Sequence, residues 1–146
     1  MKGMNTERRN TMKYEELTRR VIGVAMEVHK HLGNGFQEVV YQRALEHELT
    51  LKNVLHAREL DMPLFYKGLQ VGTRRADFVI ENKIIVEIKA LTDLEDVHLA
   101  QIINYLEAYN YEIGLLINFG TRSLQFKRAY NTKHADYKRG LKYRNT

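Results

Sequence analysis

The chain carries an acid and a lysine two residues apart inside an apolar run. Glu87 and Lys89 lie within residues 84–91, whose other members are isoleucine, valine, alanine and leucine. Residues i and i+2 of a strand point to the same face, so this carboxylate and this amine lie side by side. They need partners or a function, because burying an unpaired charge costs several kcal/mol or shifts its pKa. The same spacing at residues 81–83 and 136–138 falls in polar stretches.

A second acid, Asp77, lies on the preceding apolar stretch, and the two stretches together predict a β-hairpin. If the turn has an odd number of residues, Ile80 pairs with Ile84 and Asp77 falls opposite Glu87. Directly opposed residues have Cβ atoms about 4.5 to 5.5 Å apart. Two carboxylates that close repel each other unless a cation lies between them. An even turn would send them to opposite faces of the sheet.

Three polar side chains follow in the next predicted helix. His98, Gln101 and Tyr105 are spaced i, i+3 and i+7, so they form one line on the helix surface. The helix follows the Glu87 strand after a short connection, which places its first turns near the end of that strand. We expect the line to come within reach of the carboxylates.

Apolar periodicity gives the elements that must position these residues. Two helices are predicted over about residues 13–31 and 37–52, followed by strands at about 57–66, 70–80 and 83–90. The first helix turns an apolar side inward, formed by Leu17, Val21, Val24, Ala25, Val28 and Leu32. The second does the same with Tyr41, Ala44, Leu45 and Leu49.

The rest of the pattern predicts a helix and two more strands. Thr92 and Glu95 form a capping-box pattern that would open a helix lasting to about Asn110. Its apolar stripe is Leu99, Ile102, Ile103 and Leu106. Strands are predicted at 113–118 and 124–128. Pro63 limits the strand at 57–66 to an edge or to two pieces.

Length and composition predict one domain over residues 13–130, with a flexible N-terminus at 1–12 and a basic polar tail at 131–146. The chain has no cysteine, which excludes disulfides and thiolate chemistry and fits a reducing compartment. No apolar stretch approaches the roughly 18 residues of a membrane span. We expect a soluble cytoplasmic protein without a membrane partner, and its small size suggests a homodimer or dependence on a partner.

The net charge of +5 is unevenly distributed. Residues 122–146 carry eight basic residues and one acidic residue, whereas the segment 21–121 is acidic. Basic ends around an acidic middle suit a site that holds a cation beside a phosphate backbone. Basic ends that only keep the chain soluble would give the same pattern.

The motifs together resemble the PD-(D/E)XK nuclease superfamily, in particular its RecB-like branch. They are Asp77 and Glu87-Ile88-Lys89 on successive strands, followed by Gln101 and Tyr105 on the next helix. Gly35, Glu38 and Tyr41 also match the GxxExxY signature of a small family placed in that superfamily. The resemblance spans about residues 17–128. Asp77 follows Ala76 where many members have proline.

The resemblance implies an α/β fold with a restriction-endonuclease-like core of helix, three strands, helix and strand. The periodicity adds one helix and one short strand to that core, around a mixed central sheet flanked by helices. The resemblance also implies that Asp77 and Glu87, with the Ile88 carbonyl and Glu38, hold Mg²⁺ or Mn²⁺, which favour oxygen ligands.

The implied activity is metal-dependent hydrolysis of phosphodiester bonds in nucleic acid, with DNA favoured over RNA. Lys89 would orient the attacking water or stabilise charge on the phosphate. Gln101 and Tyr105 would position Lys89 or the substrate. Arg74, Arg75 and His98 would contact the nucleic acid.

Plainer interpretations remain for each residue. Asp77 and Glu87 could be exposed charges paired with Arg75 or Lys89, and Glu38 could serve the helix dipole. His98 could cap its helix. Tyr41 fits a core position with its hydroxyl at the rim. The competing function is a nuclease-like module that binds nucleic acid or a protein partner without turnover.

Overall fold

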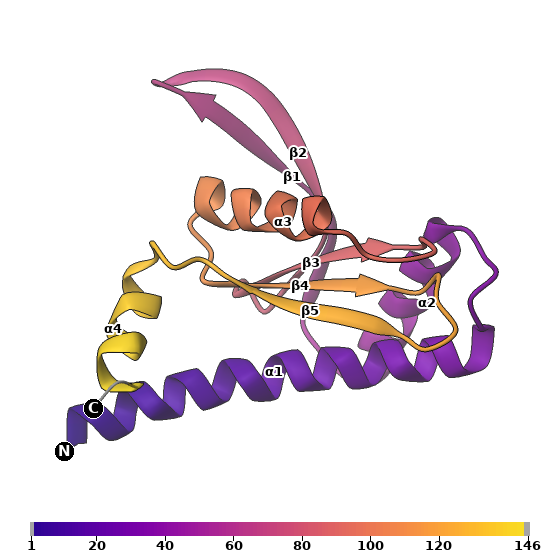
Figure 1. Cartoon of the computed structure of the whole chain (residues 1–146), viewed down its shortest axis with the longest axis horizontal. Coiled ribbons are helices and arrows are strands. Elements are labelled where there is room, and N and C mark those ends of the chain that lie inside the picture. The colour runs from indigo at the N-terminus through magenta and orange to yellow at the C-terminus, as the bar shows by residue number, and fades with distance from the viewer. Residues whose placement is uncertain (1, 145–146) are drawn as a thin grey trace.

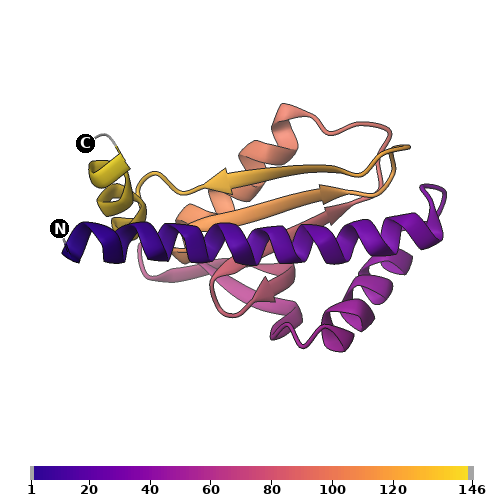
Figure 2. The same ribbon diagram turned by 90° about the horizontal axis from the view of Figure 1, so that it is seen from below.

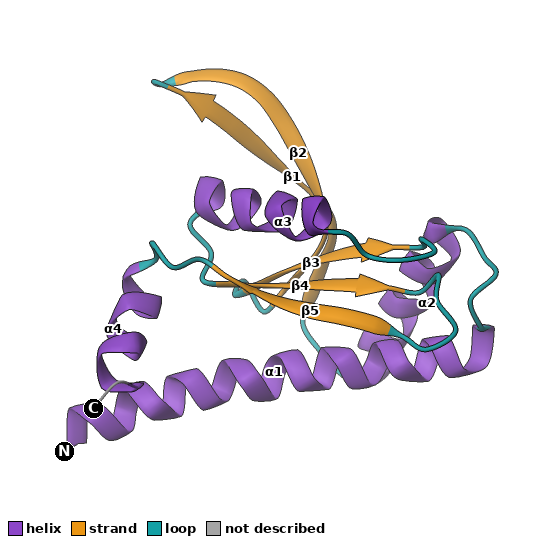
Figure 3. Ribbon diagram, in the orientation of Figure 1, coloured by secondary structure: helices purple, strands orange, loops and turns teal. Residues whose placement is uncertain are grey.

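The computed structural model describes residues 2–144 of the chain, which fold as an α/β structure around one mixed sheet (Figure 3). The strands are β1 (His56–Tyr66), β2 (Leu69–Ile80), β3 (Ile84–Lys89), β4 (Ile113–Asn118) and β5 (Gln125–Tyr130). They lie in the order β1-β2-β3-β4-β5. Strands β3 and β4 are parallel and the other neighbours are antiparallel.

Helices cover both faces of this sheet. They are α1 (Lys2–Leu32), α2 (Glu38–Leu51), α3 (Asp96–Tyr109) and α4 (Ala135–Arg144). Figure 1 shows α3 on one face and α1 on the other, and Figure 2 shows α1 running across the sheet from below. The predicted fold class, a restriction-endonuclease-like mixed sheet flanked by helices, is confirmed. None of the described helices is long and apolar enough to cross a membrane.

The predicted inward faces of the first two helices are the observed ones. The stripes of α1 and α2 pack on alternate residues of β2, β3 and β4, including Phe78, Val86 and Ile117. On the opposite face Ile102 and Leu106 of α3 are buried, with Leu99 and Ile103 packed beside them. Successive strand residues point to opposite faces, so a strand covered on both sides reads as a continuous apolar run. Strand β3 is such a strand.

Helix α3 begins later than predicted. The capping-box pattern placed its start at Thr92, but the N-cap residue is Glu95 and the helix starts at Asp96. The backbone N–H of Glu95 donates to His98 Nδ1 at 3.0 Å, so histidine takes the place of the usual N3 glutamate. The helix ends as predicted, with Asn110 as C-cap in the left-handed region at φ 58°.

Both ends of the chain are more helical than we expected. Helix α1 extends back to Lys2, through the segment predicted to be flexible, and α4 lies in the predicted polar tail. Figure 2 shows α4 beside the N-terminal part of α1. The tail is anchored by the buried Asn131, whose N–H donates to Glu112 O at 2.8 Å and whose Nδ2 donates to Leu106 O at 3.2 Å.

Strands β1 and β2 form a long hairpin whose outer half projects beyond α3 (Figure 1). Pro63 lies on β1, which is an edge strand as predicted. Tyr109 of α3 donates its hydroxyl to Met62 O at 3.0 Å and so holds the base of the hairpin. The inner part of β2 is therefore fixed where it enters the sheet.

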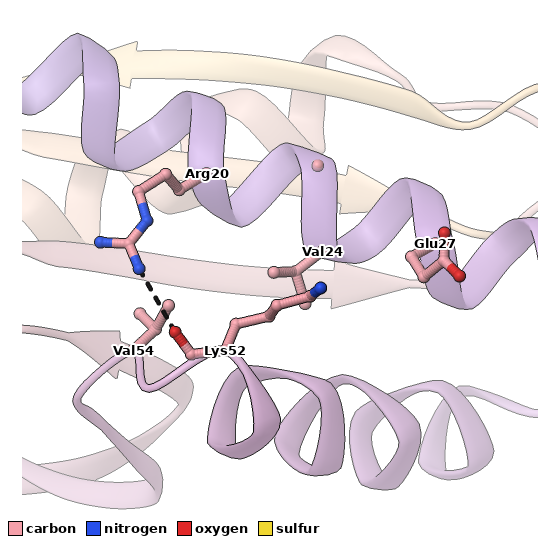
Figure 4. A pocket seen from close by; sticks show the side chains of 6 residues that line it. Arg20, Val24, Glu27, Lys52 and Val54 are labelled. Carbon is pink, nitrogen blue, oxygen red and sulfur yellow. Dashed lines mark hydrogen bonds between the residues drawn. The ribbon is translucent and has the colours of Figure 1, made fainter.

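A groove of about 310 Å³ lies between α1 and the C-terminal end of α2 (Figure 4). Its walls include Val24 and Val54, and Arg20 Nη2 donates to Lys52 O across it at 3.4 Å. The groove is at the opposite end of α2 from Glu38. The groove is therefore separate from Glu38.

Candidate metal centre

The turn between β2 and β3 sets the register of the two carboxylates. It has three residues, 81–83, of which Glu81 and Asn82 have positive φ. Ile80 pairs with Ile84, as the odd-turn prediction required, and the regular pairing continues to Phe78 and Val86. Asp77 and Glu87 are the next residues on the two strands, where β2 begins to leave β3.

At this point the side chain of Asp77, and not the backbone of β2, accepts a hydrogen bond from β3. Its Oδ2 accepts the backbone N–H of Ile88 at 2.8 Å. On the other side of β2, the register with β1 is the same at the Arg58–Phe78 pair and at the Leu60–Ala76 pair, and Glu59 between them has φ 55°. Asp77 is thus held in the gap between β2 and β3.

The carboxylate of Glu87 is almost completely buried, which lowers the stability of the fold when the group is ionised. Only 3% of the residue is exposed, and its Oε1 is buried without a hydrogen-bond partner. Burial, and then the nearby charge of Asp77, raise its pKa from 4.5 to about 8, against the opposing effects of Arg74 and Lys89. The positive charges of Arg74 and Lys89 therefore only partly compensate an ionised Glu87. Its Oε1 has no hydrogen bond that a metal ion would have to displace.

A third carboxylate enters from α2. Glu38 is half-buried, and burial and the charge of Asp77 raise its pKa while Lys89 and Arg74 oppose the rise. Gln42, one turn further along α2, links the two acids because its Nε2 lies 3.1 Å from Asp77 Oδ1 and 3.4 Å from Glu38 Oε1. Gln42 was not predicted from the sequence. Its i, i+4 spacing from Glu38 was the available signal.

Lys89 stands at the end of β3 beside this group and interacts electrostatically with both Glu38 and Glu87. The backbone after it is fixed by Asn118, which is fully buried at the end of β4. Asn118 Oδ1 accepts Leu91 N–H at 2.8 Å and its Nδ2 donates to Leu91 O at 3.0 Å. Phe119 N–H also donates to Lys89 O at 2.9 Å. The lysine therefore extends from a rigid backbone.

The predicted polar line on α3 is divided by the structure. Tyr105 is half-buried, and the Arg74 guanidinium lies 4.6 Å from the centre of its ring. Gln101 lies exposed, about one turn before it. His98 serves the start of the helix through Nδ1, in agreement with the capping interpretation. A substrate contact by Gln101 or His98 stays a prediction.

The two adjacent arginines of β2 have different surroundings. Arg74 turns inward, with Nη2 3.3 Å from Glu87 Oε2. Arg75 is 59% exposed, and its Nε donates to Asp61 Oδ1 on β1 at 2.9 Å. Arg74 thus lies beside the carboxylates, and Arg75 forms an ion pair on the surface. Contact of either arginine with nucleic acid stays a prediction.

Tyr41 holds the loop that leads into Glu38. It is fully buried, and its ring stacks on Phe119 with centroids 4.7 Å apart. Its hydroxyl donates to Gly33 O at 2.6 Å and accepts Phe36 N–H at 3.1 Å. The tyrosine of the GxxExxY pattern therefore packs in the core and fixes the entry to α2.

The side chains present suit a divalent metal. Glu38, Asp77 and Glu87 offer carboxylate oxygens, the ligand type that Mg²⁺ and Mn²⁺ prefer. The unpartnered Oε1 of Glu87 and the mutual repulsion of the acids are the features that a bound cation would relieve. Lys89 completes a set of groups suited to phosphate chemistry.

A second group of metal-ligand residues lies elsewhere. Glu112, His134 and Asp136 have ligand atoms within 4.8 Å of one another. Glu112 precedes β4 at the end opposite to Asn118, which pairs with Lys89, so this group lies about 20 Å along the strand from the carboxylates. Asp136 is paired with Arg139, and His134 Nδ1 accepts the Asp136 N–H at 3.1 Å.

Comparison with known proteins agrees with this architecture. Among solved structures, the one titled "Crystal structure of SSO0001" matches with a TM-score of 0.51 and 20% sequence identity. The alignment covers 73% of this chain and 55% of that one, so the chain matches about half of the length of its structural relative. At this identity the match shows the fold alone. A search of curated proteins finds no match.

The family comparison covers most of the chain. The model for the PD-(D/E)XK nuclease superfamily matches residues 15–129, which include α2, the β2–β3 hairpin and α3. This range contains Glu38, Asp77, Glu87 and Lys89. The chain belongs to the PD-(D/E)XK nuclease superfamily.

Proposed function

We propose that this protein is a metal-dependent nuclease that hydrolyses phosphodiester bonds of nucleic acid, with DNA as its preferred substrate. The observation that carries the proposal is the buried Glu87, whose Oε1 has no hydrogen-bond partner, beside Asp77 and Lys89. An ionised glutamate in this position is costly for the fold and useful to a cation site. Membership of the superfamily supports the same function.

Asp77, Glu87 and Glu38 would hold Mg²⁺ or Mn²⁺, with the Ile88 carbonyl as a further ligand. The bound ion would lower the pKa of a water and stabilise charge on the phosphate. Lys89 would orient that water or donate to the phosphate oxygen, from a backbone fixed by Phe119 and Asn118. Gln42 would keep Asp77 and Glu38 in position.

Arg74 and the residues of α3 would serve the substrate. Arg74 has a guanidinium that can bind a phosphate with two parallel hydrogen bonds, and Tyr105 supports it from one side. Gln101 and His98 lie on the same helix as Tyr105 and would contact the substrate beside it. The eight basic residues of 122–146 would add attraction for the nucleic-acid backbone that does not depend on sequence.

Cleavage by purified protein tests the proposal. DNA and RNA substrates, single-stranded, duplex and branched, are incubated with Mg²⁺, Mn²⁺ or EDTA. We expect metal-dependent cleavage of DNA that falls at least about 100-fold in Asp77→Asn, Glu87→Gln and Lys89→Ala. The control variant is Glu107→Gln, on an acid that belongs to an ion pair outside the site. Activity that survives in both carboxylate variants would contradict the proposed site.

Metal binding separates the nuclease from a binding module without turnover. A ligand that binds only the folded state raises stability by RT ln(1 + [L]/Kd), about 2.7 kcal/mol at 100 times Kd. We expect Mn²⁺ to raise the melting temperature of the wild type and to leave that of Glu87→Gln unchanged. Nucleic-acid binding without metal stabilisation and without cleavage would favour the binding module.

A further inference from the structure

We propose that Arg74 is the counter-cation of the carboxylate site in the metal-free protein. The Arg74 side chain leaves Glu87 when a metal binds there, and it then binds a phosphate of the nucleic acid. Metal loading and substrate binding are thereby coupled through one side chain. This inference rests on the proposed function, since it requires a metal at Glu87. It adds a dependence of each ligand on the other.

The ion pair between Arg74 and Glu87 leaves hydrogen-bonding atoms of both side chains without a partner. Arg74 Nη2 and Glu87 Oε2 are 3.3 Å apart, which is longer than a strong charge-assisted hydrogen bond. The Nε of Arg74 is buried without a hydrogen-bond partner, and so is Oε1 of Glu87. Each partner therefore uses only part of its bonding capacity.

The two side chains differ in freedom. The Glu87 side chain is 5% exposed, whereas that of Arg74 is 38% exposed. The backbone of Arg74 is held by its pairing with Met62, whose carbonyl accepts the Tyr109 hydroxyl. The long arginine side chain can thus turn about a fixed base toward solvent, while the carboxylate stays in place.

Tyr105 provides a surface for this movement. The guanidinium lies 4.6 Å from its ring centre, and an arginine on an aromatic face is stabilised without a directional hydrogen bond. The planar group can therefore exchange the carboxylate for another anion while it keeps its aromatic contact. A phosphate diester is a suitable acceptor, since it accepts two parallel N–H donors.

Electrostatics then links the two ligands. A divalent cation on Glu87 repels a guanidinium that occupies the same carboxylate, so Arg74 weakens metal binding while no phosphate is present. Once a phosphate accepts Arg74, that competition ends and the metal binds more tightly. By thermodynamic reciprocity the metal strengthens nucleic-acid binding by the same factor.

Calorimetric titration with Mn²⁺ tests this coupling, at pH 8.0 with and without a phosphorothioate DNA oligonucleotide that resists cleavage. Without DNA, we expect Arg74→Gln to bind Mn²⁺ at least about fivefold more tightly than the wild type. DNA should tighten Mn²⁺ binding about fivefold or more in the wild type and less than twofold in Arg74→Gln.

Two further variants separate charge from position. Arg74→Lys keeps the charge, so its Mn²⁺ affinity without DNA should stay within about twofold of the wild type. Arg75→Gln removes the same charge from the neighbouring exposed residue and should leave the DNA-free Mn²⁺ affinity unchanged.

Equal or weaker Mn²⁺ binding by Arg74→Gln, or full coupling retained in it, would overturn the role of Arg74 and leave the proposed function standing. If the wild type binds no Mn²⁺ and Glu87→Gln behaves identically, the metal site itself is wrong and both proposals fall.

Discussion

At the scale of single residues, the buried carboxylate of Glu87 works against the stability of the fold. Its carboxylate is buried beside Asp77, and Arg74 and Lys89 compensate only in part. A protein selected for stability alone would place an apolar residue here, as it does at Ile85 and Val86 of the same strand. Retaining an acid at such a cost is typical of functional sites.

The burial of Glu87 predicts a pH dependence of folding. The pKa of Glu87 is raised from 4.5 to about 8, so between these values the folded state holds a proton that the unfolded state has lost. The stability contributed by the protonated group is complete below pH 4.5 and is lost as pH rises toward 8. The slope reaches at most about 1.4 kcal/mol per pH unit.

Urea unfolding of the metal-free protein from pH 5 to pH 9 measures this effect. The wild type should lose stability relative to Glu87→Gln as pH rises through the window. Glu107→Gln, on an exposed acid, should follow the wild type. Parallel curves for the wild type and Glu87→Gln would contradict the assignment.

Gln42 should control the geometry of the acids without holding the metal itself. Its amide lies between Asp77 and Glu38, and loss of such a supporting hydrogen bond typically lowers metal affinity 10- to 100-fold. We expect Gln42→Ala to weaken Mn²⁺ binding by about that factor in calorimetry. His47→Ala, on the exposed side of the same helix, is the control. An unchanged affinity in Gln42→Ala would remove Gln42 from the site.

At the scale of elements, α2 delivers two site residues and depends on Tyr41 for its placement. Tyr41→Phe removes the hydroxyl that joins Gly33 O and Phe36 N–H in the loop before Glu38. We expect a loss of about 1 to 3 kcal/mol in the free energy of unfolding by urea, because two partly buried hydrogen bonds of about 0.5 to 1.5 kcal/mol each are lost. Tyr66→Phe, on the exposed part of the β1–β2 hairpin, should change it by less than about 0.5 kcal/mol. Equal effects of the two substitutions would contradict the clamp.

The elements that could be predicted from the sequence are those with a strong local signal. The two-residue alternation predicted that Ile80 pairs with Ile84 if the turn has an odd number of residues, and the observed turn of three residues meets that condition. The start of α3 was predicted at the wrong residue, because histidine at N3 replaced the expected acid. Helix α4 was missed because its segment is polar and is anchored by tertiary contacts of Asn131.

The proximity of some candidate site residues was predictable to a similar degree. Strand register brought Asp77 and Glu87 together, and helix spacing placed Tyr105 nearby. The contact of Arg74 with Glu87 and the contact of Gln42 with Asp77 depend on how α2, β2 and β3 pack against one another. No local sequence pattern encodes this packing, so the two contacts could not be derived from residue spacing alone.

At the scale of the whole molecule, the sheet separates two groups of charged side chains. The carboxylates lie where β2 leaves β3, and Glu112, His134 and Asp136 lie near the opposite end of β4. Both contain ligands that a divalent metal can use. The proposed function requires that the metal bind at Asp77 and Glu87 and not only at Glu112, His134 and Asp136.

Anomalous scattering from a crystal soaked in Mn²⁺ tests this choice directly. We predict an anomalous peak within bonding distance of Asp77 and Glu87 in the wild type and its loss in Glu87→Gln. A peak only at Glu112, His134 and Asp136, or none beside Asp77 and Glu87, would contradict the assignment of this site as the metal centre of a nuclease.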